Sequence, residues 1–403
     1  MKMTKILALG AALLGGSAVS SAAQELHFIM CGGEVRAADQ AAADEFIAEN
    51  PGVTVNIEAV PWGTCQDKSL TLAAAGDPPS LSYMGSRTLK QLATNDLIVP
   101  VEISPEAQEL YQPGVLATVS DGGQFWGYPH AFSTKALYMN CGLIEEAGAA
   151  CEAPQTWDDL YNLAKAVTDN TDAAGIGLAG KDFDNTMHQF LNYLYSNGGK
   201  VLDADTGEVL LNSPETIETL EFYGKLAEVA QDGPTAWERD ELKNLFNDGG
   251  IAMYISGPWG RGQHNEEINQ KIVPIPAGPN GQQGTILITD SIAVFKGSGE
   301  EELALKLAQK LTSGAAQYDL DESWGLTPIL QYEKAGVENP YYANDEFWDV
   351  YTAGISKGGP EPLVTDFKSL QSVFTNMIQG ILLKDDTVEN LVSIAAEELE
   401  EIK

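Results

Sequence analysis

The sequence predicts an α/β protein made of two lobes, each with a mainly parallel sheet flanked by helices. Three observations support this fold class. Strand-like and helix-like segments alternate as β-α-β-α-β-α over residues 24–95. After a leader of 23 residues, 380 of the 403 residues remain, which exceeds one compact hydrophobic core. Two strand pairs are each interrupted by a short polar break, near residues 130 and 290, where the chain could cross between lobes.

Apolar periodicity and turn residues define the N-terminal elements. We expect strands at 26–30, 53–60 and 80–84, and helices at 37–49, 67–75 and 88–95. In parallel sheets, ligands bind beyond the C-terminal ends of the strands. Here those ends are followed by residues 31–33, by Trp62 and by residues 85–87, so these positions are candidate ligand contacts.

The segment 123–140 joins two short strand-like runs, 125–128 and 136–139, through a polar stretch. Pro129 disfavours helix just before it and biases Tyr128 towards extended geometry. This segment fits a hinge between two lobes, although its residues alone also fit a turn inside one sheet. The run 285–295 is interrupted in the same way at Asp290-Ser291, which predicts a second crossing.

Helix-start signals organise the rest of the chain. Thr156 is a candidate N-cap before an acidic first turn, and Ser213 followed by Pro214 marks another helix start, running to about residue 230. A helix is expected to open at Asn140. Further helices are expected at 186–197, 240–247, 301–312, 365–381 and 387–401, with strands at 176–178, 251–255 and 272–275.

Residues 1–23 have the form of an export signal. Lys2 and Lys5 precede an apolar core at 6–16, and residues 21–23 offer a small-residue cleavage site. The apolar core is too short to span a bilayer. The first cysteine after the cleavage site is Cys31, so we do not expect a lipid anchor at the new N-terminus. The prediction is a free periplasmic protein.

The chain is strongly acidic, with a formal net charge of −35 that becomes −37 once Lys2 and Lys5 leave with the signal. Such a charge argues against nucleic acid and anionic membranes as partners. The acidic residues are scattered along the chain, as on a solvated surface, and do not by themselves indicate a cationic ligand.

The four cysteines of an exported chain predict two disulfides. Cys141 and Cys151 flank one short helix and are the easiest to join, so Cys31 would pair with Cys65 at neighbouring strand ends. Their spacing is not that of a zinc site, and only four histidines occur, so no metal site is expected. We also find no phosphate-binding loop or nucleophile motif, and we predict neither a cofactor nor an enzyme.

Four stretches, in order along the chain, resemble one known family. They are 72–81 (LAAAGDPPSL), 127–140 (GYPHAFSTKALYMN), 154–160 (PQTWDDL) and 247–259 (NDGGIAMYISGPW). Each is weak alone, but together they cover nearly the whole mature chain. The chain resembles the extracellular solute-binding proteins of ABC importers, specifically the family 1, maltodextrin-binding-like sugar binders. It departs from them in having Cys31 and Cys65 on cleft-side loops and a Cys-Gly-Gly sequence after the first strand.

The resemblance implies a type II-like periplasmic-binding-protein fold with the ligand cleft at a multi-strand hinge. Lobe 1 would comprise 24–130 and 287–338, and lobe 2 would comprise 131–286 and 339–403, with crossings near 130, 287 and 340. It also implies a carbohydrate ligand, delivery to the membrane subunits of an ABC permease, and action as a monomer.

A sugar site needs aromatic platforms for C–H faces and polar groups for hydroxyls. The candidate ligand contacts are Gly33, Trp62, Ser86, Arg87, His130, Ser133, Phe183, Asp184, Trp259, Arg261, Asp290, Trp324 and Asp366. The resemblance places a stacking tryptophan at Trp259. Alternatives stay open for most of the others: core packing for the tryptophans, a helix-start ion pair for Arg87, hinge packing for His130, and an exposed acidic loop for Phe183 and Asp184.

Two other functions fit the sequence less well. The same scaffold could bind a phosphorylated or sulfonated small molecule through Arg36, Arg87 and Arg261. A secreted carbohydrate-active enzyme is a remote alternative, because carboxylates are plentiful. The layout of many helices around two crossings favours closure around a ligand over catalysis.

Overall fold

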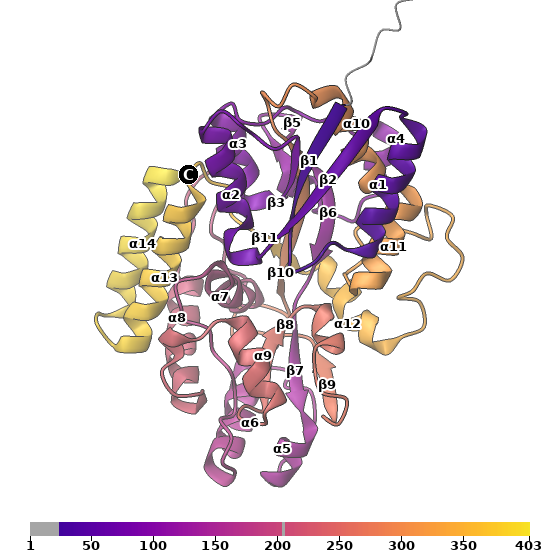
Figure 1. Ribbon diagram of the computed structural model, residues 1–403. Coiled ribbons are helices and arrows are strands. Elements are labelled where there is room, and N and C mark those ends of the chain that lie inside the picture. Colours follow the sequence, from indigo (N-terminus) through magenta and orange to yellow (C-terminus); the bar gives the residue numbers. More distant parts are fainter. Residues whose placement is uncertain (1–23, 204–205) are drawn as a thin grey trace, which may run out of the picture.

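The computed structural model describes residues 24–203 and 206–403, and the predicted export signal lies outside them. The molecule has two lobes, each built around its own sheet, one above the other in Figure 1. Within the described residues, no helix has both the length and the apolar character required to cross a membrane.

The larger lobe is organised on a six-stranded sheet in the order β11-β10-β3-β1-β2, with β6 also paired to β10. β1 is parallel to β2 and β3, and β10 is parallel to β11, whereas β10 runs antiparallel to β3 and β6. The strands are β1 Gln24–Cys31, β2 Val53–Val60, β3 Leu81–Gly85, β6 Tyr128–Ser133, β10 Thr285–Val294 and β11 Gly358–Pro360.

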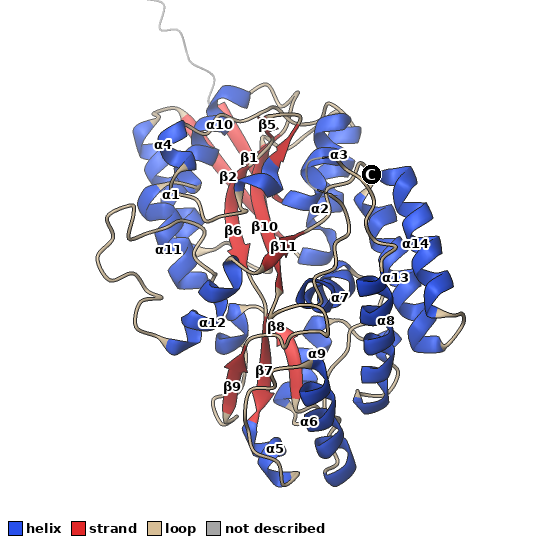
Figure 2. Ribbon diagram, turned by 180° about the vertical axis from the view of Figure 1, so that it is seen from behind, coloured by secondary structure: helices blue, strands red, loops and turns tan. Residues whose placement is uncertain are grey.

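Helices cover both faces of this sheet, with α1 and α11 on one side and α2 and α3 on the other (Figure 2). The helices are α1 Ala37–Glu49, α2 Trp62–Ala74, α3 Leu89–Thr94, α4 Pro105–Gln108, α10 Glu301–Leu311 and α11 Gly314–Trp324, with the short 3₁₀ helices η1 Ser86–Thr88 and η2 Leu116–Val119. A small hairpin, β4 Ser120–Asp121 and β5 Gln124–Phe125, lies before β6.

The smaller lobe contains a three-stranded sheet in the order β8-β7-β9, formed by β7 Ala136–Asn140, β8 Met253–Ser256 and β9 Gln270–Val273. The α/β class is as predicted, but the strands of this sheet are antiparallel. Parallel pairing in this lobe is limited to isolated bridges, such as the one between Ile176 and Ala230. The expected strand at 176–178 is therefore a single bridge, because its neighbour is a loop and not a strand.

The remaining helices are α5 Cys141–Glu146, α6 Trp157–Asn170, α7 Asp184–Ser196, α8 Pro214–Leu226, α9 Arg239–Asn247, α12 Glu346–Ile355, α13 Phe367–Leu383 and α14 Val388–Ile402, with 3₁₀ turns η3 Ala227–Val229, η4 Pro234–Ala236 and η5 Pro258–Gly262. Apolar residues of α6, α7, α8, α13 and α14 share one core with β7 and β8. The C-terminal helices thus pack beside α7 and α8, as Figure 1 shows.

Local capping explains several helix starts that the sequence predicted. Thr156 accepts a hydrogen bond from the Asp159 amide, and the Asp159 side chain accepts one from the Thr156 amide, which completes a capping box for α6. Ser213 caps α8 with Pro214 at its first position, and Asn140 caps α5. Boundaries differ elsewhere: α2 begins at Trp62, five residues before the expected start, and α11 and α12 were not predicted.

The two predicted strand breaks are wrong in detail. β6 continues through Pro129, and β10 continues through Asp290 and Ser291. The register between β6 and β10 shifts between Asp290 and Ser291, opposite Pro129. A proline is tolerated in a sheet at such an irregularity because it has no N–H to donate to the ladder. After β6 the chain leaves the large sheet at Thr134–Lys135 and enters β7 of the small lobe.

Both predicted disulfides are present. Cys31 pairs with Cys65, with Cα atoms 5.4 Å apart, and Cys141 pairs with Cys151, with Cα atoms 5.3 Å apart. The first joins the end of β1 to the first turn of α2, directly beside Trp62. It therefore fixes the start of α2 against the sheet edge at which the strand ends meet.

Candidate functional site

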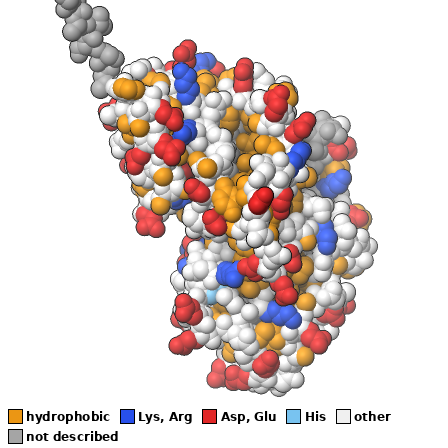
Figure 3. Space-filling model, turned by 90° about the vertical axis from the view of Figure 1, so that its right-hand side faces the viewer, with side chains coloured by type: hydrophobic (Ala, Val, Ile, Leu, Met, Phe, Trp, Pro, Cys, Tyr) orange, Lys and Arg blue, Asp and Glu red, His pale blue; other side chains and the backbone are white. Residues whose placement is uncertain are grey.

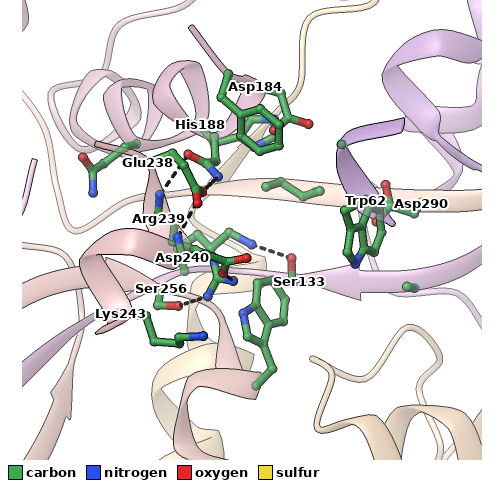
Figure 4. Close-up of a pocket in the computed structure, with 18 of the residues that line it drawn as sticks. Trp62, Ser133, Asp184, His188, Glu238, Arg239, Asp240, Lys243, Ser256 and Asp290 are labelled. Atoms are coloured by element: carbon green, nitrogen blue, oxygen red, sulfur yellow. Dashed lines mark hydrogen bonds and ion pairs between the residues drawn. The ribbon is translucent and has the colours of Figure 1, made fainter. Parts of the chain in front are cut away.

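A cavity of about 540 Å³ lies between the lobes and is lined by residues of both. This volume is within the range of small-molecule sites, roughly 300–1,000 Å³. Figure 4 shows Arg239, Lys243 and Ser256 on one side of the pocket and Trp62 and Asp290 on the other. The large lobe contributes the loops after its strands, as expected for ligand sites in such sheets.

Aromatic rings form the wall on the side of the large lobe. Trp62 stacks with Trp324 at a centroid distance of 6.5 Å, and it meets Tyr83 edge-on at 5.3 Å. Arg36 lies over the Trp324 ring, 3.5 Å from its centroid, and donates to the Cys31 carbonyl. Trp62 is nevertheless 40% exposed, so a large apolar ring faces the cavity.

Trp259 lies on the side of the small lobe, in the 3₁₀ turn η5 that follows β8. The Lys135 Nζ is 4.3 Å from the centroid of the Trp259 ring, and the Arg239 guanidinium is 5.6 Å from it. Arg239 also donates to the Ser256 Oγ at 3.1 Å and pairs with Asp240. Lys243, one turn further along α9, lines the same pocket.

A buried ion cluster centred on Arg87 joins the two lobes. Its Nη2 is 2.8 Å from Asp184, at the start of α7 in the small lobe, and its Nη1 is 3.3 Å from both Asp290 and Glu361. His188 Nε2 is 2.6 Å from Glu361, and the cluster is largely closed to solvent. Because one guanidinium meets three carboxylates, its charge is fully used within the protein.

Gly85 makes room for this cluster. A Cβ added at Gly85 would lie 2.5 Å from the Arg87 Cζ, closer than real atoms approach. Its φ of −58° is ordinary, so the requirement is for space and not for backbone freedom.

The cluster perturbs the acidity of its members in opposite directions. Burial raises the pKa of Asp184, but the charges of Arg87 and His188 outweigh it, and the net pKa is lowered. Burial raises the pKa of Asp290 overall, and the charge of Arg87 only partly offsets it. Tyr83, which donates to Asp290 at 3.0 Å, has its pKa raised well above 10 by burial and by that carboxylate.

Lys135 is a buried cation of a different kind. Its side chain lies between β6 and β7, and its Nζ donates to the Ser133 Oγ at 2.8 Å. Burial, and then the positive charge of Arg239, lower the pKa of this amine to about 7. Among the described residues, no carboxylate lies within 4.0 Å of it. It is therefore a desolvated amine that faces the cavity without a counter-ion.

The structure brings nine of the predicted contacts together around the cavity: Gly33, Trp62, Arg87, Ser133, Phe183, Asp184, Trp259, Asp290 and Trp324. Four others lie elsewhere. Ser86 is buried behind the cavity, where its Oγ is 2.7 Å from the Ser291 Oγ. His130 is fully buried, with Nε2 2.9 Å from Asp39, and therefore packs inside the large lobe.

The other two are surface residues. Arg261 is half-exposed and pairs with Asp345 at 2.6 Å. Asp366 is the N-cap of α13, where it accepts hydrogen bonds from the Ser369 amide and hydroxyl. Arg36 is stacked on Trp324, Arg87 is surrounded by carboxylates, and Arg261 is paired with Asp345. None of the three arginines predicted to bind an anionic solute is therefore available for one.

Several lining residues were not predicted as contacts: Tyr83, Lys135, His188, Gln189, Asn192, Arg239 and Lys243. A signal existed for some of them. The α7 segment carries buried His188, Gln189 and Asn192 within an otherwise apolar run, and Lys135 stands directly before an apolar strand. Arg239 and Lys243 gave no signal, since basic residues one turn apart are ordinary on an exposed helix.

The described residues contain no group of His, Cys, Asp and Glu side chains arranged to hold a metal ion. What the site offers is aromatic faces from both lobes and a dense set of hydrogen-bonding groups between them. Such a site can enclose a small polar molecule that has apolar faces.

Comparison with known proteins identifies the family. A model of the bacterial extracellular solute-binding protein family matches residues 32–318. A putative binding protein of Brucella abortus is 29% identical over 346 residues, covering 84% of this chain and 83% of the relative. The galactooligosaccharide-binding protein of Bacillus subtilis is 25% identical over 246 residues, covering 58% of this chain and 56% of that protein.

Solved structures share the fold. A solute-binding protein of Thermotoga lettingae bound to alpha-D-tagatose superposes with a TM-score of 0.82 at 23% identity, covering 94% of this chain and 99% of that one. Maltose-bound MalE3 of T. maritima gives a TM-score of 0.80 at 23% identity, covering 94% and 100%. The two-lobed solute-binding fold predicted from the sequence is confirmed. With its family model matching most of the chain, this protein belongs to the bacterial extracellular solute-binding proteins.

Proposed function

We propose that this chain is the substrate-binding component of an ABC importer, which captures a carbohydrate between its lobes and delivers it to a membrane permease. The family assignment supports a binding role. Relatives named as galactooligosaccharide-binding and maltodextrin-binding proteins, and neighbours solved with tagatose and maltose, support the carbohydrate class.

The observation that carries the proposal is the distribution of aromatic rings. Trp62, Tyr83 and Trp324 come from the large lobe and Trp259 comes from the small lobe, and all four line one cavity. Sugar rings present apolar C–H faces that stack on aromatic rings and hydroxyl rims that need polar partners. Asn185, Gln189 and Asn192 of α7 supply amides at the same cavity.

The carboxylates of the pocket support binding over catalysis. Asp184 and Asp290 are both held by Arg87, Glu238 caps α9, and Asp240 pairs with Arg239. A glycosidase needs two carboxyl groups free to act on the substrate. Each lining carboxylate is instead committed to a partner within the protein, so we propose that the chain is not an enzyme.

Closure of the lobes is the proposed mechanism. The ligand would favour the closed arrangement because it touches both lobes only in that state. The ion pair between Arg87 and Asp184 already spans the lobes, so part of the closed interface is made by the protein itself. The ligand would add the contacts at the aromatic rings.

We also propose that residues 1–23 act as an export signal and that the mature protein works in the periplasm. The description of the family as extracellular supports export. Cys31, the cysteine nearest the predicted cleavage site, is bonded to Cys65, which favours a free protein over a lipid-anchored one. Mass spectrometry of the protein secreted from its host would test the cleavage after residue 23.

Thermal unfolding of the mature protein against a panel of mono- and oligosaccharides tests the carbohydrate assignment. A ligand at 100 times its dissociation constant adds about 2.7 kcal/mol of stability, which is readily measured. We expect at least one saccharide to raise the melting temperature and to reduce the radius of gyration in small-angle scattering.

The matched variants are Trp259→Ala and Trp126→Ala. Trp259 lines the cavity, whereas Trp126 lies outside it and donates its indole N–H to the Asp121 carbonyl. Trp259→Ala should abolish the ligand-induced shift, and Trp126→Ala should keep it at a lower baseline temperature. A panel in which no saccharide shifts the melting temperature, while amino acids or other solutes do, would overturn the assignment.

A further inference from the structure

The pocket has a charge distribution unlike that of the rest of the protein. The chain has 23 basic and 58 acidic residues. Figure 3 shows acidic side chains spread over one face of the molecule, with fewer basic ones among them. Four basic residues (Arg87, Lys135, Arg239 and Lys243) and four acidic ones (Asp184, Glu238, Asp240 and Asp290) line the cavity. Basic groups are therefore enriched there relative to the whole chain. Lys135 and Arg239 contact the Trp259 ring, and Lys243 follows Arg239 by one turn of α9.

Those three basic groups have little internal compensation. Lys135 is 9% exposed and has one hydrogen-bond acceptor, the Ser133 Oγ, for an ammonium with three donors. Lys243 has no ion-pair partner among the described residues. Arg239 pairs with Asp240, a carboxylate whose side chain is 59% exposed. By contrast, Arg87 meets three carboxylates in the same pocket.

A buried amine without a counter-ion is costly unless a ligand supplies the missing charge. We propose that the ligand is an acidic saccharide whose carboxylate seats against Lys135 and Arg239, next to the Trp259 ring. This inference rests on the proposed function and specifies its substrate class. The remaining donors of Lys135 and the guanidinium of Arg239 are the groups that would bind the carboxylate oxygens.

A carboxylate fits this position better than a phosphate. The N-terminus of α9, which could otherwise receive a phosphate dianion, is already occupied by protein carboxylates. Glu238 accepts from the Asp240 amide at 3.0 Å, and Glu241 accepts from the Glu238 amide at 2.9 Å. These negative charges would repel a second charge on the ligand, whereas a monoanion needs only the lysine and the arginine.

The protonation of Lys135 provides an independent readout. The charged groups that face it are Arg239, Asp290, Glu361 and Arg87, and burial together with Arg239 lowers its pKa to about 7. A carboxylate bound beside the amine would favour its protonated form. Binding of an acidic sugar at pH 8 should therefore take up a proton, whereas binding of a neutral sugar should not.

Isothermal titration calorimetry of the mature protein with matched sugars tests the proposal. The pairs are galactose with galacturonate, glucose with glucuronate, and galactobiose with digalacturonate, and glucose 6-phosphate separates phosphate from carboxylate. We expect one acidic member to bind at least about tenfold more tightly than its neutral partner. Its titration at pH 8, repeated in buffers of different ionisation enthalpy, should show proton uptake.

Lys135→Met should remove both the preference and the proton uptake. Lys165→Met, which changes the same charge in an exposed pair with Asp169, should leave them unchanged. Circular dichroism would verify that each variant is folded. Tighter binding of the neutral sugars, or of glucose 6-phosphate, would overturn this inference. Either result would leave the proposed function intact. Failure of every sugar, neutral or acidic, would overturn both.

Discussion

Replacing Lys135 by methionine should make the protein more stable. The lysine amine is buried, it has one hydrogen-bond acceptor, and the neighbouring charge that affects it most is that of the cation Arg239. Methionine has nearly the same length and no charge to desolvate. A buried charge without a partner destabilises a protein, and an apolar side chain of similar size removes that cost. A residue kept for a ligand can thus cost stability when the ligand is absent.

The lowered pKa of Lys135 gives the size of the expected gain in stability. An ordinary lysine has a pKa of 10.5, and this one has a pKa of about 7. One pKa unit corresponds to about 1.4 kcal/mol, so holding the charged amine in the folded protein costs about 5 kcal/mol. The variant loses the hydrogen bond to Ser133 and the contact with the Trp259 ring, together worth about 2 kcal/mol. We therefore expect a net gain of about 3 kcal/mol at pH 6.

The gain should depend on pH with a definite sign. Below pH 7, Lys135 is protonated in both the folded and the unfolded chain, so the full cost is present. Between pH 7 and 10.5 the unfolded chain binds the proton more tightly, so the wild type becomes more stable relative to the variant as the pH rises. By pH 9 the cost has fallen to about 2 kcal/mol, and the two proteins should be nearly equally stable.

Urea unfolding of the wild type, Lys135→Met and Lys165→Met at pH 6, 7, 8 and 9 measures this difference. Lys165 is half-exposed and pairs with Asp169 four residues along α6, so its replacement should change stability by less than about 0.5 kcal/mol at every pH. A Lys135→Met protein that is less stable than the wild type at pH 6, or a difference that does not change between pH 6 and 9, would refute the reasoning.

Three further outcomes follow from the packing. Arg87→Met should destabilise the protein by about 3–5 kcal/mol in urea unfolding, because it leaves three buried carboxylates without their cation. Gly85→Ala should cost about 2 kcal/mol, because its Cβ meets that guanidinium, whereas Gly63→Ala, with open space in α2, should be neutral or stabilising. Replacing Cys31 and Cys65 by serine opens a loop of 34 residues and should cost about 4 kcal/mol, measured by thermal unfolding.

The sequence predicted the elements that local rules determine. Helix α1 and strand β2 begin and end where periodicity and turn residues place them. Thr156 and Ser213 cap their helices as expected, since an N-cap depends only on the next few residues. Pro129 was misread because its place in a strand depends on the register irregularity with β10, some 160 residues away in sequence.

The sequence predicted those residues of the candidate site whose position follows from the topology of the sheet. Trp62 and Arg87 follow strand ends of a parallel sheet, and both reach the cavity. His130 and Ser133 stand three residues apart in β6, yet one is sealed against Asp39 and the other lines the cavity. Residues three apart in a strand point to opposite faces of the sheet, so their different positions follow from strand alternation. The sequence prediction missed this because it placed both residues in a break between strands and not within one strand.

The two buried cations of the pocket show why partners, and not burial, distinguish a structural charge from one available to a ligand. Arg87 and Lys135 are both largely closed to solvent and both line the cavity. Arg87 is surrounded by Asp184, Asp290 and Glu361, and its pKa is raised by those carboxylates even though burial opposes them. Lys135 lacks such partners, and its pKa falls.

A ligand carboxylate at Arg87 would add a fourth carboxylate to a site where three already surround one cation, and like charges in a buried site repel. At Lys135 it would supply the first. The same comparison explains why the arginines that the sequence offered for anion binding are poor candidates, while a lysine without a carboxylate partner is a good one. Ligand binding and stability are therefore expected to oppose each other at Lys135, whereas Arg87 contributes to stability alone.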